Sequence, residues 1–197
     1  MDAVTRVPRL AAPLALVALV LGLCAVVRPT AVAAQKAPSL DIHYVPTPNE
    51  VVQTMLTMAK VTKDDLVYDL GSGDGRIVIA AAAQYGARGI GIELDPELVA
   101  RARAAAKKAG VDQLVEFRQA DLFKTDLSKA TVVTLYLSPS INLRLEGKLK
   151  RELAPGSRVV SHRFPVGTWT PERDVIVGRN HVYFWTIPSP PPATPRP

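Results

Sequence analysis

The chain has 197 residues, of which 48% are hydrophobic, so it can form one domain of ordinary size with a buried core. Its net charge is +6, without a block of five like charges or interleaved aromatic and basic residues, so we expect no nucleic-acid partner. The single cysteine, Cys24, excludes intramolecular disulfides and cysteine-rich zinc sites, and we expect no metal site.

The N-terminal 34 residues have the features of a targeting or anchoring segment. Two arginines precede an uncharged run over residues 10–27, whose length lies between a signal-peptide core and a full membrane span. Small residues ending at Ala34 have the spacing of a signal-peptide cleavage site. We therefore expect 1–34 to be a cleaved signal peptide or a retained membrane anchor. The protein is then exported or membrane-associated, and the sequence leaves open which side of the membrane the domain faces.

The rest of the chain predicts an extended linker, one folded domain and a short tail. Pro46 and Pro48 disfavour helix in the linker, residues 35–48. In chain order, the domain over 49–187 is predicted to contain a helix over 49–60, a strand over 66–70, a helix to about 85, a strand over 89–93, a helix from 96 that ends at 110, strands over 115–118 and 131–137, a helix to 153, a strand over 157–161, and a hairpin of 174–177 with 181–187. The proline-rich residues 188–197 predict a disordered tail.

Strands that alternate with helices predict an α/β fold, a Rossmann-like, doubly wound and mainly parallel sheet covered on both faces. The C-terminal hairpin adds an antiparallel strand. Ligands of such sheets bind beyond the carboxyl ends of the strands. Four segments fall at those ends, namely 69–75, 93–94, 121–122 and 137–138. We therefore expect them to meet at one rim.

A glycine turn lies between the strand over 66–70 and the next helix. Gly71, Gly73 and Gly75 leave bare backbone there, where a ligand can approach a helix N-terminus. A dinucleotide-binding turn needs another glycine where Arg76 stands, which argues against NAD and FAD. Glu93 ends the next strand, where a carboxylate can accept hydrogen bonds from both ribose hydroxyls.

Two aspartates complete the predicted rim. Asp121 can accept from an adenine amino group, or it can simply cap a turn. Asp69 can orient the glycine turn or meet the amino group of an amino-acid moiety. Together with Glu93, these carboxylates describe a pocket for adenosine joined to an amino acid, with no place for a pyrophosphate.

These residues resemble the motifs of class I S-adenosylmethionine-dependent methyltransferases, from about Val45 to Ile187. The resemblance implies S-adenosylmethionine as cofactor, held by Asp69, Gly71, Ser72, Gly73, Gly75, Glu93, Asp121 and Leu122. The chain is also similar to the protein-lysine methyltransferases of ATP synthase c-subunit and mitochondrial carrier type and their prokaryotic relatives. That similarity is carried by the segments 44–47, 69–79, 121–122, 145–153, 161–165 and 169–171. It implies a protein lysine, membrane proteins included, as the methyl acceptor.

The acceptor side is less defined by the sequence. Tyr136 and Ser138, after the strand over 131–137, are our candidates for lining it, although Tyr136 is equally suited to the core. His162 is either a base or a structural histidine. No Asn-Pro-Pro-Tyr sequence occurs, which disfavours methylation of nucleic-acid bases. Methylation of a small molecule and a non-catalytic module that binds an adenosine ligand remain the alternatives, and the oligomeric state is not readable.

Overall fold

The computed structural model of the protein describes residues 44–189. The predictions for 1–34, for most of the linker and for residues 190–197 lie outside this range. Within it, no helix is long and apolar enough to cross a membrane.

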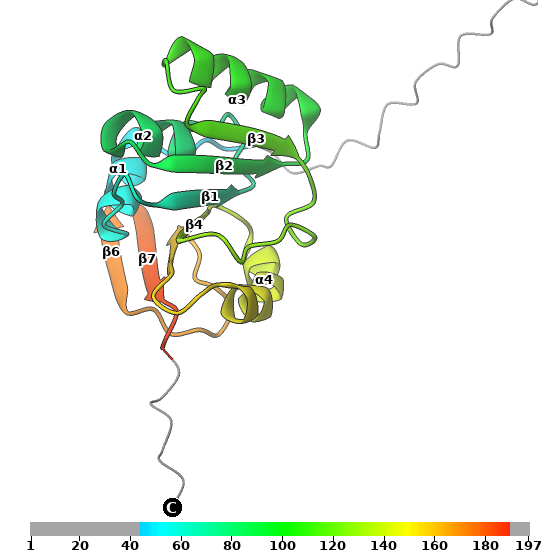
Figure 1. Ribbon diagram of the computed structural model, residues 1–197. Helices are drawn as coiled ribbons and strands as arrows, with labels where there is room; N and C mark the ends of the chain where they lie inside the picture. Colours follow the sequence, from blue (N-terminus) through cyan, green and yellow to red (C-terminus); the bar gives the residue numbers. More distant parts are fainter. Residues whose placement is uncertain (1–43, 190–197) are drawn as a thin grey trace, which may run out of the picture. The chain divides into compact units, whose positions relative to one another are not determined.

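All the predicted helices and strands of the domain are present (Figure 1). Their bounds are α1 Asn49–Met58, β1 Leu66–Leu70, α2 Arg76–Tyr85, β2 Arg88–Glu93, α3 Pro96–Lys108, β3 Val115–Gln119, β4 Val132–Leu135, α4 Pro139–Glu152, β5 Arg158–His162, β6 Arg173–Val177 and β7 Asn180–Thr186. The strand from Leu66 to Leu70 has the bounds that the sequence predicts.

The strands form one seven-stranded sheet in the order β3-β2-β1-β4-β5-β7-β6. The first five strands of the chain pair in parallel, and β7 runs antiparallel to both β5 and β6. The winding reverses between β1 and β4, so the carboxyl ends of β1, β2 and β4 meet where such folds bind ligands. The Rossmann-like fold with an antiparallel C-terminal hairpin is thus confirmed.

Hydrophobic cores fill both faces of the sheet, because successive residues of a strand point to opposite faces. In β4, for example, Val132 packs into one core and Val133 into the other, and both are fully buried. Helices α1, α2 and α3 contribute to the first core, whereas α4 and the loop over 120–130 contribute to the second. Figure 1 shows α3 and α4 on opposite sides of the sheet.

Most elements differ from the sequence prediction by one or two residues at a boundary, and β4 is shorter than 131–137 at both ends. Helix α1 begins at Asn49, where the carbonyl of Pro48 accepts the amides of Val51 and Val52, and it ends at Met58 rather than at residue 60. Thr131 lies just before β4, although its backbone amide still donates to the carbonyl of Leu66 at 3.0 Å.

The amino end of the sheet is held by Asp65, far from the carboxyl ends. Its carboxylate accepts the hydroxyl of Thr131 at 2.7 Å and the amide of Thr62 at 2.8 Å, and it forms an ion pair with Arg158. Burial acts to raise the pKa of Asp65, but these hydrogen bonds outweigh burial and hold the pKa below its ordinary value. Arg158 also donates to the carbonyl of Ala59 at 2.8 Å, so the cluster ties α1, β1 and β5 together.

Candidate active site at the carboxyl ends of the strands

The glycine turn leaves β1 with a backbone that only glycine adopts readily. The φ angles of Gly71, Gly73 and Gly75 are +78°, +54° and +81°. The amide of Gly71 donates to the carbonyl of Ile92 at 2.8 Å, which fixes the turn against the end of β2. The predicted glycine turn between β1 and α2 is therefore present and anchored to the neighbouring strand, with protein side chains packed beside each of its three glycines.

Glu93 lies against this turn from the end of β2. One carboxylate oxygen accepts the amide of Gly73 at 2.9 Å, and the other accepts the amides of Leu94 and Asp95 at 2.7 and 3.0 Å. A carboxylate offers about four acceptor positions, so capacity remains for a hydroxyl of a ligand. The structure thus brings Glu93 to the glycine turn, in keeping with the expectation that these two segments meet at one rim.

Asp69 is buried at the end of β1 with 2% of its surface exposed. Among the described residues its one hydrogen-bond partner is the hydroxyl of Thr134, at 2.7 Å. Burial raises the pKa of Asp69 to about 7, opposed by the bond from Thr134 and reinforced by the negative charges of Glu93 and Asp74. A buried carboxylate without a cationic partner matches the ammonium group of an amino-acid ligand.

Residues 44–48, which we call the strap, pack against the glycine turn and the start of α2. The ring of Tyr44 occupies the space that a side chain at Gly73 would need. Arg76 donates to the carbonyl of Thr47 at 2.8 Å and pairs with Asp74 at 2.6 Å. Sequence reasoning used Tyr44 only as part of a resemblance and missed this contact, which no local pattern encodes because it joins residues far apart in the chain.

The site residues predicted near adenine have structural roles of their own. An oxygen of Asp121 accepts the amide of Phe123 at 2.8 Å, which is the turn-capping alternative, and Leu122 is 9% exposed within the second core. The hydroxyl of Ser72 is buried without a hydrogen-bond partner in the described chain and lies against Gly91. The backbone amide of Ser72 donates to the carbonyl of Ile92, so both the amide and the buried hydroxyl of Ser72 point into the protein. Adenine contact by Asp121 and Leu122 stays a prediction.

The acceptor candidates follow β4. The side chain of Leu137 packs on Gly71, whereas Tyr136 stacks on the ring of His162 with 3.9 Å between centroids. Ser138 is exposed at the start of α4, and its hydroxyl lies 3.1 Å from that of Ser140. Tyr136 is partly buried, so it belongs neither to the core nor to open solvent.

His162 is a buried histidine with both ring nitrogens engaged. Nδ1 lies 3.2 Å from the hydroxyl of Thr47, and Nε2 lies 3.1 Å from the side-chain oxygen of Asn180. Burial lowers the pKa of His162; Asn180 opposes this and the charge of Arg163 adds to it. These contacts favour the structural interpretation of His162 over that of a free base.

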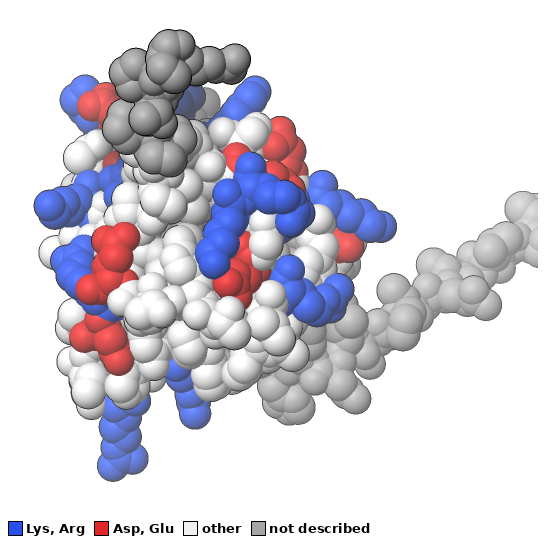
Figure 2. Space-filling model, turned by 90° about the horizontal axis from the view of Figure 1, so that it is seen from below, with Lys and Arg blue, Asp and Glu red and all other residues white. Residues whose placement is uncertain are grey.

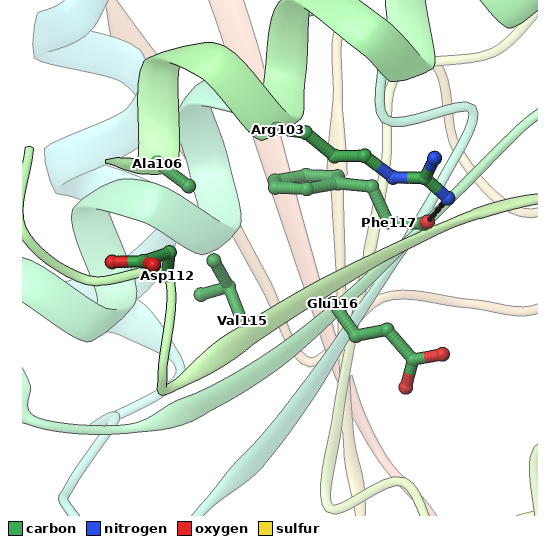
Figure 3. Close-up of a pocket in the computed structure, with 6 residues that line it drawn as sticks. All are labelled: Arg103, Ala106, Asp112, Val115, Glu116 and Phe117. Carbon is green, nitrogen blue, oxygen red and sulfur yellow. Dashed lines mark hydrogen bonds between the residues drawn. The ribbon is translucent and has the colours of Figure 1, made fainter. Parts of the chain in front are cut away.

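Two hollows on the described surface lie away from this rim. Figure 3 shows one of about 220 Å³ between α3 and β3, where Arg103 donates to the carbonyl of Phe117 at 2.7 Å. Another, beside Met58 and Arg173, lies at the C-terminal end of α1. Within residues 44–189 no three His, Cys, Asp or Glu side chains gather as metal ligands. The site is therefore defined by the glycine turn and its carboxylates.

A glycine turn after β1, a carboxylate at the end of β2 and this strand order define a class I S-adenosylmethionine-dependent methyltransferase. The residues fit the cofactor: Asp69 offers an unpaired buried charge for its ammonium group, and Glu93 offers free acceptor capacity for its ribose. The sequence model of the ANTKMT methyltransferase domain matches residues 69–173, and the chain belongs to this family. The resemblance seen in the sequence is thereby confirmed.

Known relatives agree with this assignment. A protein-lysine N-methyltransferase of Saccharolobus islandicus is 44% identical over 151 residues, which cover 74% of this chain and 94% of that protein. The adenine nucleotide translocase lysine N-methyltransferase of Mus musculus is 41% identical over 149 residues, which cover 75% of this chain but 64% of the mouse protein. A crystal structure described as an RNA methyltransferase from Salinibacter ruber with S-adenosyl-L-homocysteine superposes with a TM-score of 0.73 at 58% identity, covering 76% of this chain and 98% of that one.

Proposed function

We propose that this protein transfers the methyl group of S-adenosylmethionine to the Nζ atom of lysine side chains in a protein acceptor. The observation that carries the proposal is the 44% identity with a protein-lysine N-methyltransferase across 94% of that enzyme's length. The mouse relative acts on a lysine as well, according to its name.

The chemistry of the rim is compatible with a lysine acceptor. The bound cofactor supplies a methyl group that is already activated, so the protein must align the attacking amine and exclude water. A lysine amine has an ordinary pKa of about 10.4 and must lose its proton before attack. Tyr136 follows β4, and Ser138 and Ser140 lie at the start of α4, so their hydroxyls offer neutral oxygen acceptors for the amine. Tyr136 is partly buried, and a partly buried site favours the uncharged amine.

RNA is the competing acceptor, because the Salinibacter structure carries that description. An RNA-binding enzyme is expected to present a continuous basic surface to the phosphates. Figure 2 shows acidic and basic side chains interspersed on the face it displays, with wide uncharged areas between them. This face offers no continuous basic track, and the two relatives named as lysine methyltransferases favour a protein acceptor.

The deciding experiment labels a lysate of the source cells with the full chain and tritiated S-adenosylmethionine. Label that survives ribonuclease, is lost with protease and is recovered as methyl-lysine by mass spectrometry supports the proposal. Label lost with ribonuclease would identify an RNA methyltransferase, and label confined to the small-molecule fraction would identify a metabolite methyltransferase. Glu93→Gln serves as the inactive control, with Glu97→Gln, an exposed neighbour on α3, as its matched counterpart.

We further propose that the apolar N-terminal segment attaches the protein to a membrane or directs its export, and that the acceptor lysine belongs to a membrane-associated protein. The support is the uncharged run over 10–27 between flanking arginines. Mass spectrometry of the mature N-terminus, together with membrane fractionation, tests this. A mature chain that begins at residue 1 or 2 and stays in the soluble fraction would contradict it.

A further inference from the structure

The strap, β4, β5 and β7 meet at the ring of His162. This ring is 1% exposed, although it ends a strand at the rim where the site lies. Thr47 reaches it from the strap, Asn180 from the start of β7 and Tyr136 from the end of β4. Four segments that are distant in sequence therefore converge on one imidazole beside the acceptor side.

One neutral tautomer satisfies both ring nitrogens of His162. A proton on Nε2 is donated to the side-chain oxygen of Asn180, and Nδ1 then accepts the hydroxyl of Thr47. Thr47 is itself 4% exposed, so its hydroxyl depends on this bond. The ring orientation of His162 is thus fixed from both sides.

Tyr136 is the group that this fixed ring supports. Its ring lies 3.9 Å from that of His162, tilted by 35°, and the next residue, Leu137, packs on Gly71 of the glycine turn. Tyr136 is therefore linked to the glycine turn through its neighbour Leu137 and to the strap through His162, which Thr47 contacts. The backbone immediately after His162 is strained, since Arg163 has a φ of +70° without being glycine. Its amide donates to the carbonyl of His181 at 2.7 Å, which holds this conformation.

We propose that His162, held between Thr47 and Asn180, is a positioning residue that fixes Tyr136, and that the Tyr136 hydroxyl aligns the methyl acceptor. The strap is then part of the acceptor side, since Thr47 orients the imidazole on which Tyr136 rests. This inference requires methyl transfer but does not require that the acceptor be lysine, so it stands or falls separately from the proposed substrate.

The test uses substitutions that change one hydroxyl each. Thr47→Val removes the hydroxyl at constant shape, Thr47→Ser keeps it, and Tyr136→Phe removes the tyrosine hydroxyl. Thr54→Val, on the exposed side of α1, controls for the substitution itself. With the acceptor found by labelling, we expect Thr47→Val to lower kcat by about 5- to 50-fold because Tyr136 is misplaced, with KM and the Kd for S-adenosylhomocysteine held within about two-fold. Thr47→Ser should restore kcat.

The proposal also predicts that substitutions at Thr47 and Tyr136 have coupled, non-additive effects on kcat. In a Tyr136→Phe background, Thr47→Val should lower kcat by less than about two-fold, because the group that it positions is already gone. Independent, multiplicative losses would overturn the proposal, and so would an unchanged kcat for Thr47→Val in a chain with normal thermal unfolding.

A second readout needs no acceptor. Sinefungin carries an amine where the cofactor carries its methyl group, whereas S-adenosylhomocysteine carries nothing there. Calorimetry should show that Tyr136→Phe and Thr47→Val each weaken sinefungin by about five-fold while S-adenosylhomocysteine changes by less than about two-fold. Equal effects on both ligands, or none on sinefungin, would refute the alignment role even if no acceptor had been found.

Discussion

The carboxyl of Asp69 lies at the end of β1, buried and bonded to the hydroxyl of Thr134. Its pKa of about 7 in the folded chain exceeds the ordinary value of 3.8. Below pH 3.8 both the folded and the unfolded chain hold this proton, and the group contributes its full stability. Between pH 3.8 and about 7 the unfolded chain alone has lost the proton, so stability falls as pH rises.

Asp69→Asn should therefore stabilise the ligand-free protein at pH 8 by roughly 1–4 kcal/mol, with little effect near pH 4. Thermal unfolding of both proteins across this range measures the difference. The same substitution should weaken S-adenosylmethionine binding, because it removes the buried carboxylate that we predict to bind the ammonium group. If the difference in stability between Asp69→Asn and the wild type were no larger at pH 8 than at pH 4, the raised pKa of Asp69 would be contradicted.

Glu93 is a second residue whose role can be isolated. In Glu93→Gln, an NH2 group replaces one of the two carboxylate oxygens that accept the backbone amides of Gly73, Leu94 and Asp95. The substitution also removes the negatively charged acceptor that we predict for the ribose hydroxyls. We expect the Kd for S-adenosylhomocysteine to rise by about 10- to 100-fold. Calorimetry checks this against Glu97→Gln, which should bind as the wild type does.

At the scale of the elements, the junction of β1 and α2 depends on a glycine with no room beside it. A Cβ on Gly75 would lie 2.5 Å from the ring of Phe117 and 2.9 Å from Ala102, at a φ of +81°. Gly75→Ala should cost more than about 3 kcal/mol of folding free energy, because overpacking adds to backbone strain. Gly110 provides the matched comparison, since its φ is +69° but no atom lies within 4 Å of the added Cβ.

Gly110→Ala should cost only about 1 kcal/mol, the strain of the left-handed conformation by itself. Urea unfolding of the two variants measures the contrast. If both variants lost the same free energy of unfolding, close packing of α2 against α3 and β3 at Gly75 would not explain the loss in Gly75→Ala.

The sequence predicted the order and type of every element, because alternating burial and glycine or proline boundaries are local signals. It overextended β4, because the β-branched and aromatic run over 131–137 continues past both ends of the strand Val132–Leu135. The convergence of Glu93 on the glycine turn followed from the expectation that the carboxyl ends of the strands meet at one rim. The contact between Tyr44 and Gly73 and the contact between Thr47 and His162 did not follow, because they depend on tertiary packing between distant segments.

At the scale of the whole molecule, the two cores of the described domain are built from residues between 51 and 187. A chain shortened to begin at Gln35 should unfold within about 2 °C of the full chain, because it keeps every described contact. A chain that begins at Asn49 loses the strap, with the bonds of Thr47 to Arg76 and His162.

We expect that second shortening to cost roughly 1–3 kcal/mol and to lower the unfolding temperature by several degrees. Scanning calorimetry of the two shortened chains in the same buffer distinguishes the contribution of the strap from that of the preceding residues. An equal unfolding temperature for both would mean that the strap adds no stability to the domain.

The place of β7 in the sheet has a consequence for synthesis. Although it is the last strand to be made, it inserts between β5 and β6, and its first residue, Asn180, completes the surroundings of His162. A nascent chain can form the glycine turn early, but it cannot build the acceptor side until its last strand has left the ribosome. A growing polypeptide therefore lacks the proposed surroundings of His162 until β7 has been made and has paired with β5.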